Sequence, residues 1–432
     1  MNYIEFRDYF CEFFRFDIVE KGTETYFTMP RFSDDKNWFS GKSMREIYDK
    51  LENFSFDQAT MYNNKYMEVI LENDSRNSLL FNFRNDQDDE CLKLNDDQNG
   101  ISYEISTISP ELLVYLIKRT IEKIFLKKEQ KRVDSRFFNS LRNMSMHSSY
   151  NERNSEEFED LSIIDFLFKS LRGRFVSLKI TSDKNKSFES FVNLKNGYIF
   201  NTMYSTDKVL NDCVEFDLVL FYSRTKIDRT IQQLEVAPLK TYNGDIINYY
   251  KKAMSSIDPY IQYISFYHVL EYFYDETYFR YLVKDMREKI THPDFSYKND
   301  EELLKLAKFA QNRLRQFGED GQGNELESLK YVLKEFIDIS DLKNKLSVGD
   351  VNYYSCSKVT FSDGPVVTFE DENGFGPIAK RIYFTRNSLV HSKSGKKDLT
   401  YHPYNHEEIL KKEVPLIKKI AEMTIINSAS LI

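Results

Sequence analysis

Three places in the chain carry an arginine five residues before a histidine, a spacing that could serve the cleavage of a phosphodiester. The three pairs are Arg142/His147, Arg287/His292 and Arg386/His391. In the first and third pairs an asparagine follows the arginine directly, at Asn143 and Asn387. Arginine offers a permanent charge and paired donors for phosphate oxygens, and histidine exchanges protons near neutral pH. The spacing alone does not choose among the three pairs.

The third pair lies in a segment with helical periodicity. Its apolar residues share one face of an ideal helix: Ile378, Ile382 and Leu389. Asn387 and His391 are four residues apart and fall on nearly the opposite side, while the long side chain of Arg386 can bring its guanidinium round toward His391. We therefore predict that Arg386, Asn387 and His391 form a catalytic site at a cleft or a subunit interface.

The other two pairs have weaker contexts. Arg142, Asn143 and His147 form the runner-up site, in a stretch rich in Ser, Asn and Met where side chains would be hard to hold rigid. The pair Arg287/His292 ends at a His-Pro step, which favours a helix end at which a cationic side chain stabilises the helix dipole.

Metal-free cleavage of RNA needs a base for the ribose 2′-hydroxyl, an acid for the leaving 5′-oxygen and positive charge near the phosphate. His391 can serve as base or acid, Arg386 supplies the charge, and Asn387 could orient the imidazole or the phosphate. One histidine leaves one proton-transfer role unfilled, so a symmetric homodimer with two copies of the motif across one cleft is expected. The sequence has no nucleotide-binding glycine motif and no metal-ligand cluster, and we expect neither cofactor nor metal.

Three further residues are candidates for a supporting role. His268 and Glu271 are polar residues on an aromatic-rich segment, and such groups must find partners. They form either a hydrogen-bonded pair of their own or a support in which Glu271 holds Arg386 or His391 in place. Lys393 lies in a basic loop after the motif, which could contact phosphate or be a solvated turn.

The predicted architecture is α+β, with a mixed α/β region over 1–150, a β-rich region over 151–243 and an all-α bundle over 244–432. Strands are expected at 175–180, 188–192 and 214–221. Ser43 and Glu46 have capping-box spacing, and Asp258 before Pro259 predicts a helix start. We also expect a β-prone insertion at 341–374 and a final helix kinked or restarted at Pro415.

Composition limits the setting in which the protein acts. The formal net charge of −8 gives no overall attraction to nucleic acid, so an RNA site must be local. Four scattered cysteines favour reduced thiols, and the acidic N-terminal residues differ from a signal peptide. The apolar runs are too short or too interrupted for a bilayer. These features predict a cytoplasmic protein without a membrane segment.

The stretch Arg381–Lys393 resembles the motif helix of the HEPN superfamily of ribonucleases, and Phe266–Glu271 is similar to an early helix of large bacterial HEPN proteins linked to phage defence, including the ApeA-like group. The resemblance covers about 245–432. It implies a dimeric, metal-independent endoribonuclease with Arg386, Asn387 and His391 in the active site, used as an antiviral toxin in abortive infection and controlled by a phage-derived trigger or a regulatory partner. The alternative is a non-catalytic HEPN-like module for dimerisation or for nucleotide or RNA sensing. The acidity of the chain favours the alternative, and the intact motif favours the nuclease.

Overall fold

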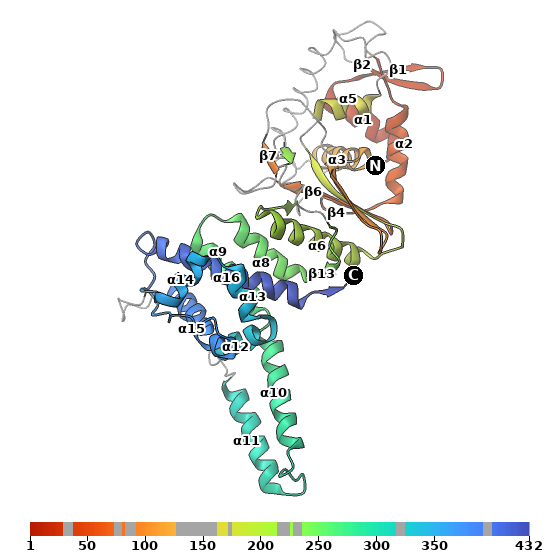
Figure 1. Ribbon diagram of the computed structural model, residues 1–432. Helices are drawn as coiled ribbons and strands as arrows, with labels where there is room; N and C mark the ends of the chain where they lie inside the picture. The colour runs from red at the N-terminus through yellow and green to blue at the C-terminus, as the bar shows by residue number, and fades with distance from the viewer. Residues whose placement is uncertain are drawn as a thin grey trace. The chain divides into compact units, whose positions relative to one another are not determined.

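The computed structural model describes the following residues: 1–28, 38–72, 80–82, 92–126, 162–171, 175–213, 225–227, 236–316, 325–391 and 400–431. The chain divides into two compact units, Met1–Leu239 and Lys240–Leu431 (Figure 1). The runner-up site of Arg142, Asn143 and His147 lies outside the described residues, as do Lys393 and the strand expected at 214–221.

The first unit contains an antiparallel sheet. Its strands, in spatial order, are β4 (Ser55–Asp57), β5 (Thr60–Tyr62), β6 (Tyr66–Glu72), β10 (Val176–Ser182), β9 (Ile101–Thr107) and β8 (Leu92–Asp96), and β11 (Asn211–Asp212) also pairs with β6. Smaller antiparallel pairings join β1 (Asp17–Lys21), β2 (Glu24–Thr28) and β3 (Trp38–Ser40), and β7 (Leu80–Asn82) with β12 (Thr225–Ile227). In β9 buried and half-buried side chains alternate, as expected when the two faces of a sheet have different neighbours.

Helices cover both faces of this sheet. The register aligns Met67, Ile180 and Tyr103 on one face, where Tyr103 stacks on Tyr198 of α6 (Phe188–Thr206). Ile70 is three residues from Met67 and faces the opposite side, because successive strand side chains alternate. Ile70 belongs to an apolar cluster built largely by four helices: α1 (Tyr3–Phe14), α2 (Lys42–Lys50), α3 (Pro110–Ile121) and α5 (Ile163–Leu171).

The structure corrects the expected middle region. The strand predicted at 175–180 is confirmed as β10, but the strand predicted at 188–192 is wrong because these residues begin α6. Ser187 caps that helix by accepting the backbone N–H of Ser190 at 3.2 Å, and this local signal outweighs the short apolar alternation. Since β10 pairs with both β6 and β9, residues 175–182 continue the fold of the N-terminal region instead of starting a β-rich region of their own. The capping box of Ser43 and Glu46 is also absent, as α2 starts after Gly41 without a side-chain cap.

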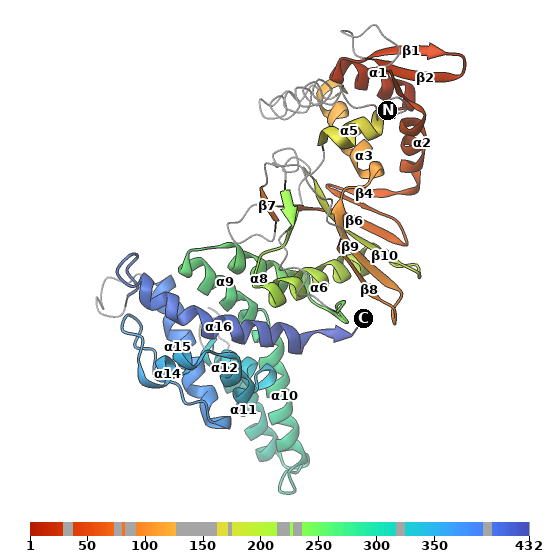
Figure 2. The ribbon, with the colours of Figure 1, turned by 45° about the horizontal axis from the view of Figure 1, so that its top comes forward.

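The second unit is mainly helical (Figures 1 and 2). Its described helices are α8 (Gly244–Ser255), α9 (Pro259–Glu271), α10 (Tyr274–Thr291), α11 (Asp300–Gln316), α12 (Glu325–Phe336), α13 (Ile339–Lys345), α14 (Val348–Cys356), α15 (Asp371–Val390) and α16 (Glu407–Ser428). Helix α9 packs against α8 and α16, and α12 packs against α10 and α15. Helices α10 and α11 form a hairpin that extends away from the other helices of this unit. A short antiparallel pair, β13 (Lys240–Thr241) with β14 (Ser430–Leu431), joins the two ends of the unit, so it is not purely α.

The predicted start of α9 is confirmed, because Asp258 accepts the backbone N–H of Tyr260 at 2.9 Å and Pro259 takes the first helical position. The prediction of a β-prone insertion at 341–374 is wrong. These residues contain most of α13, all of α14 and an irregular segment in which a single β-bridge joins Val359 and Gly364. Of the apolar residues that favoured a strand, Val367 and Phe369 are buried, whereas Val366 is exposed.

Helix α16 runs through Pro415 without a break. Proline has no N–H to donate and crowds the preceding turn, so the hydrogen-bond ladder must adapt. The hydroxyl of Tyr354 enters the ladder at this point. It donates to the carbonyl of Lys412 at 2.6 Å and accepts the N–H of Leu416 at 3.1 Å. None of the described helices is long and apolar enough to cross a membrane.

Candidate functional site

Helix α15 carries the predicted catalytic residues in its last turn and at its end. Ile378 and Ile382 are each 1% exposed and fix the buried face of this helix. Asn387 is partly exposed and His391 is exposed, as the helical periodicity predicts. His391 follows the last helical residue, and its backbone N–H donates to the carbonyl of Asn387 at 2.9 Å.

Arg386 is held between two carboxylates. Its Nη1 lies 3.2 Å from Oε2 of Glu325 on α12, and its Nη2 lies 3.7 Å from Oε1 of Glu271 on α9. Nη1 also donates to Oδ1 of Asn387 at 3.2 Å, and the guanidinium carbon lies 5.2 Å from the ring centre of Tyr267. The side chain is 16% exposed. Two carboxyl groups therefore share one guanidinium at this place.

Glu271 takes part in both arrangements that the sequence suggested. Its Oε2 lies 2.8 Å from Nδ1 of His268, and its other oxygen faces Arg386. The hydrogen bond from His268 is the main cause that lowers the pKa of Glu271, and the charge of Arg386 acts in the same direction. Glu271 therefore stays ionised and links His268 to the arginine.

Glu325 is the site residue that sequence analysis missed. Burial raises the pKa of Glu325, and the charge of Glu271 adds to this, while Arg386 and His391 oppose it. The signal of Glu325 in the sequence is weak, since an acidic residue in the first turn of a helix ordinarily just favours the helix dipole.

Two buried tyrosines lie beside Arg386, since Tyr267 contacts its guanidinium and Tyr274 packs edge-on against Tyr267. Tyr267 is fully buried and Tyr274 is 6% exposed, and neither hydroxyl makes a hydrogen bond of standard geometry with the described residues. Burial raises the pKa of both tyrosines, and the charges of Glu271 and Glu325 raise it further. Both phenols therefore remain protonated near neutral pH.

A second arginine of the motif segment, Arg381, has a different role. It is fully buried and forms a two-pronged ion pair with Glu413 of α16, at 2.8 and 2.7 Å. Its remaining Nη1 donates to the carbonyls of Ser357 and Pro365. The guanidinium also lies over the rings of Tyr353 and Tyr354. Every face of Arg381 is thus engaged by protein, and this residue ties α15 to α16.

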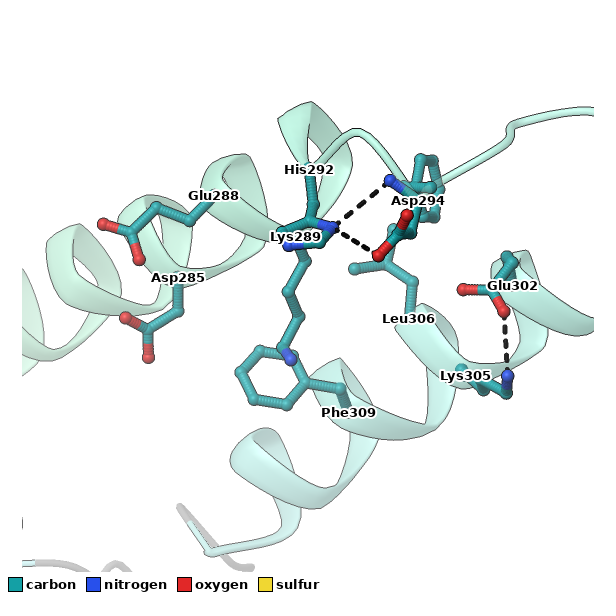
Figure 3. Close-up of a pocket in the computed structure, with 10 residues that line it drawn as sticks. Asp285, Glu288, Lys289, His292, Asp294, Glu302, Lys305, Leu306 and Phe309 are labelled. Carbon is teal, nitrogen blue, oxygen red and sulfur yellow. Dashed lines mark hydrogen bonds and ion pairs between the residues drawn. The ribbon is translucent and has the colours of Figure 1, made fainter.

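The pair Arg287/His292 lies in the helical hairpin, apart from the cluster around Arg386. His292 caps the C-terminus of α10, which confirms the predicted helix end. It lines a groove of about 580 Å³ between α10 and α11, together with Lys289 and Phe309 (Figure 3). The backbone N–H of Asp294 donates to Nδ1 of His292 at 3.3 Å, and Arg287 does not line the groove.

No family model, no curated protein and no solved structure matches this chain. Within the described ranges, no three or more His, Cys, Asp or Glu side chains are grouped so that they could hold a metal ion.

Proposed function

We propose that the C-terminal unit is a metal-independent endoribonuclease in which Arg386, Asn387 and His391 act on the phosphodiester. The observation that carries the proposal is the placement of Arg386. Its guanidinium is held by Glu325, by Glu271 and by the ring of Tyr267, it contacts Asn387, and the arginine lies five residues before an exposed histidine in the sequence. A cation that is positioned before substrate binds can stabilise a developing phosphorane without a further cost of ordering.

In the proposed reaction the ribose 2′-oxygen attacks the adjacent phosphorus and the bond from phosphorus to the 5′-oxygen breaks. One protein group takes the proton of the 2′-hydroxyl and another donates a proton to the 5′-oxygen. The products are a 2′,3′-cyclic phosphate and a free 5′-hydroxyl. Arg386 stabilises the phosphate oxygens, Asn387 orients them or the imidazole, and His391 transfers one of the protons.

We further propose that the protein acts in the cytoplasm as an RNA-cleaving toxin of the antiviral, abortive-infection type. The resemblance of the motif helix to HEPN ribonucleases supports this setting, together with a homodimer and control by a phage-derived trigger or a regulatory partner. The two carboxyl groups against Arg386 fit a nuclease that is weak until RNA displaces one of them from the guanidinium. Binding of RNA at such a local site should weaken steeply with added salt.

The test is cleavage of total tRNA and mRNA in the presence of EDTA by the full chain and by His391→Ala and Arg386→Ala. We expect each substitution to lower the rate by about 100-fold to 10,000-fold, the usual range for a lost proton-transfer group or charge donor. Arg287→Ala and His292→Ala are matched controls with the same sequence spacing and should cleave like the parent. His147→Ala tests the runner-up site. Cleavage that is unchanged in both the His391 and the Arg386 variant would refute the assignment.

A second function is favoured by one observation, the occupation of Arg386 by two carboxylates. An arginine that is already paired could simply tie α9, α12 and α15 together in a dimerisation or RNA-sensing module. Absence of cleavage, together with a dimer in sedimentation that Arg386→Ala dissociates, would support this function in place of the nuclease.

A further inference from the structure

The proposed reaction needs two proton-transfer groups, and the predicted motif supplies only His391. We propose that Glu325 is the second group and acts as the general base, so that a single chain holds both the base and the acid of the site. This inference rests on the proposed ribonuclease function. It removes the need for a second histidine from the partner copy of a dimer.

The position of Glu325 relative to Arg386 supports this role. Its carboxylate lies 3.2 Å from the guanidinium, so a phosphate bound to the same arginine would lie next to it. Its side chain is 16% exposed, which leaves an edge open to substrate while most of the group is withdrawn from water. Aside from the ion pair with Arg386, Glu325 makes no hydrogen bond or ion pair with the residues that the structure describes. Only its Oε2 is engaged, by Arg386, whereas both oxygens of Glu271 are engaged, one by His268 and one by Arg386.

The charged groups around Glu325 and Glu271 indicate which of the two carboxylates is the general base. The charges that act on Glu325 are those of Glu271 on α9, which is itself paired with His268, and those of Arg386 and His391 on α15. The ring centre of Tyr267 lies 5.2 Å from the guanidinium carbon of Arg386 and 6.1 Å from the ring centre of Tyr274. The pKa of Glu271 is lowered and that of Glu325 is raised, chiefly by burial. Because a carboxylate with a raised pKa is the stronger base, Glu325 suits proton abstraction and Glu271 suits anchoring.

The proposed step is balanced in protons and bonds. Ionised Glu325 takes the proton of the 2′-hydroxyl as the 2′-oxygen forms its bond to phosphorus. The bond between phosphorus and the 5′-oxygen breaks, and protonated His391 gives its proton to that oxygen. Glu325 ends protonated and His391 ends neutral, and exchange with water restores both groups.

The experiment is the dependence of kcat/KM on pH for cleavage of a defined RNA, measured for the full chain and for Glu325→Gln. A base that must be ionised and an acid that must be protonated give a bell-shaped profile. Glutamine keeps the size and polarity of the side chain but takes no proton. We expect Glu325→Gln to lose the acidic limb of the profile and to lower the rate by about 100-fold to 10,000-fold. Glu325→Asp, which keeps a carboxylate, should retain the acidic limb.

Glu327→Gln is the matched control, since Glu327 lies on the same helix with a 41% exposed side chain and pairs only loosely with Lys330, at 3.9 Å. It should behave like the parent. An active Glu325→Gln variant with an intact acidic limb would overturn the role of Glu325 while the loss of activity in His391→Ala still upheld the nuclease. A rise in activity would also overturn it, because Glu325 would then restrain Arg386. A parent protein that cleaves no RNA would instead refute the proposed function itself and the inference with it.

Discussion

The buried ion pair between Arg381 and Glu413 allows a sharp test of how α15 is held in the second unit. Arg381 is fully buried and Glu413 is 2% exposed, and they share two hydrogen bonds. In Glu413→Gln the guanidinium would keep its charge but lose its counter-ion in a fully buried site. Removing one partner of a buried pair costs about 3–5 kcal/mol. Tyr353 would also lose the carboxylate to which its hydroxyl donates at 2.8 Å.

The measurement is hydrogen exchange of the full chain, read by mass spectrometry on peptides from α15 and α16. A loss of about 3–5 kcal/mol corresponds to amide exchange that is faster by about 100-fold to several thousand-fold. Glu408→Gln is the matched control on α16, because that carboxylate is 81% exposed and exposed pairs contribute little. Its exchange should stay within a few-fold of the parent.

A double variant, Arg381→Met with Glu413→Leu, separates the cost of an unpaired charge from the value of the pair. Apolar residues of similar volume often replace a buried ion pair without loss of stability. We therefore expect the double variant to exchange more slowly than Glu413→Gln in both helices. Exchange in Glu413→Gln that is no more than about tenfold faster than in the parent would refute the argument that a desolvated charge controls this contact.

Three further predictions concern other parts of the fold. Tyr354→Phe removes the hydroxyl that bridges the hydrogen-bond ladder of α16 beside Pro415, and it leaves a buried N–H and C=O unpaired. We expect the free energy of unfolding in urea to fall by about 1–3 kcal/mol, and a change below about 0.5 kcal/mol would contradict the bridging role. The pKa of Glu271 is lowered in the folded state, so its contribution to stability is present above the unfolded pKa of about 4.3 and is lost as pH falls through the folded pKa. Urea titrations should show a destabilisation by Glu271→Gln that shrinks from pH 7 toward pH 3. Gly100 has a φ of +64°, and a Cβ at this position would meet Asp183 at 2.7 Å. Thermal melting should therefore show that Gly100→Ala is destabilised by about 1–2 kcal/mol or more, and an unchanged Tm would contradict the strain.

The buried face of α15 and the start of α9 could be predicted from sequence because the interactions involved are local. The apolar spacing of Ile378 and Ile382 determines which side of a helix must be buried, and Asn387 and His391 then face away. A cap such as Asp258 acts on an N–H two residues away, so its signal is also contained in a short window. The strand predicted at 188–192 was wrong because the pattern of five residues is too short to distinguish a strand from the start of a long helix.

The partners of the two arginines of α15 depend on tertiary structure alone. Glu325 is 61 residues before Arg386 in the sequence, and Glu413 is 32 residues after Arg381, so no local pattern connects them. The sequence by itself determined that an amphipathic helix presents an arginine, an asparagine and a histidine near its end. Only the packing of α9, α12 and α16 around that helix decided the partners of its arginines. Arg381 forms a buried ion pair, and Arg386 lies between one carboxyl group with a raised pKa and one with a lowered pKa. The physical reason is that helix periodicity is fixed by neighbours along the chain, whereas charge pairing and burial are fixed by neighbours in space.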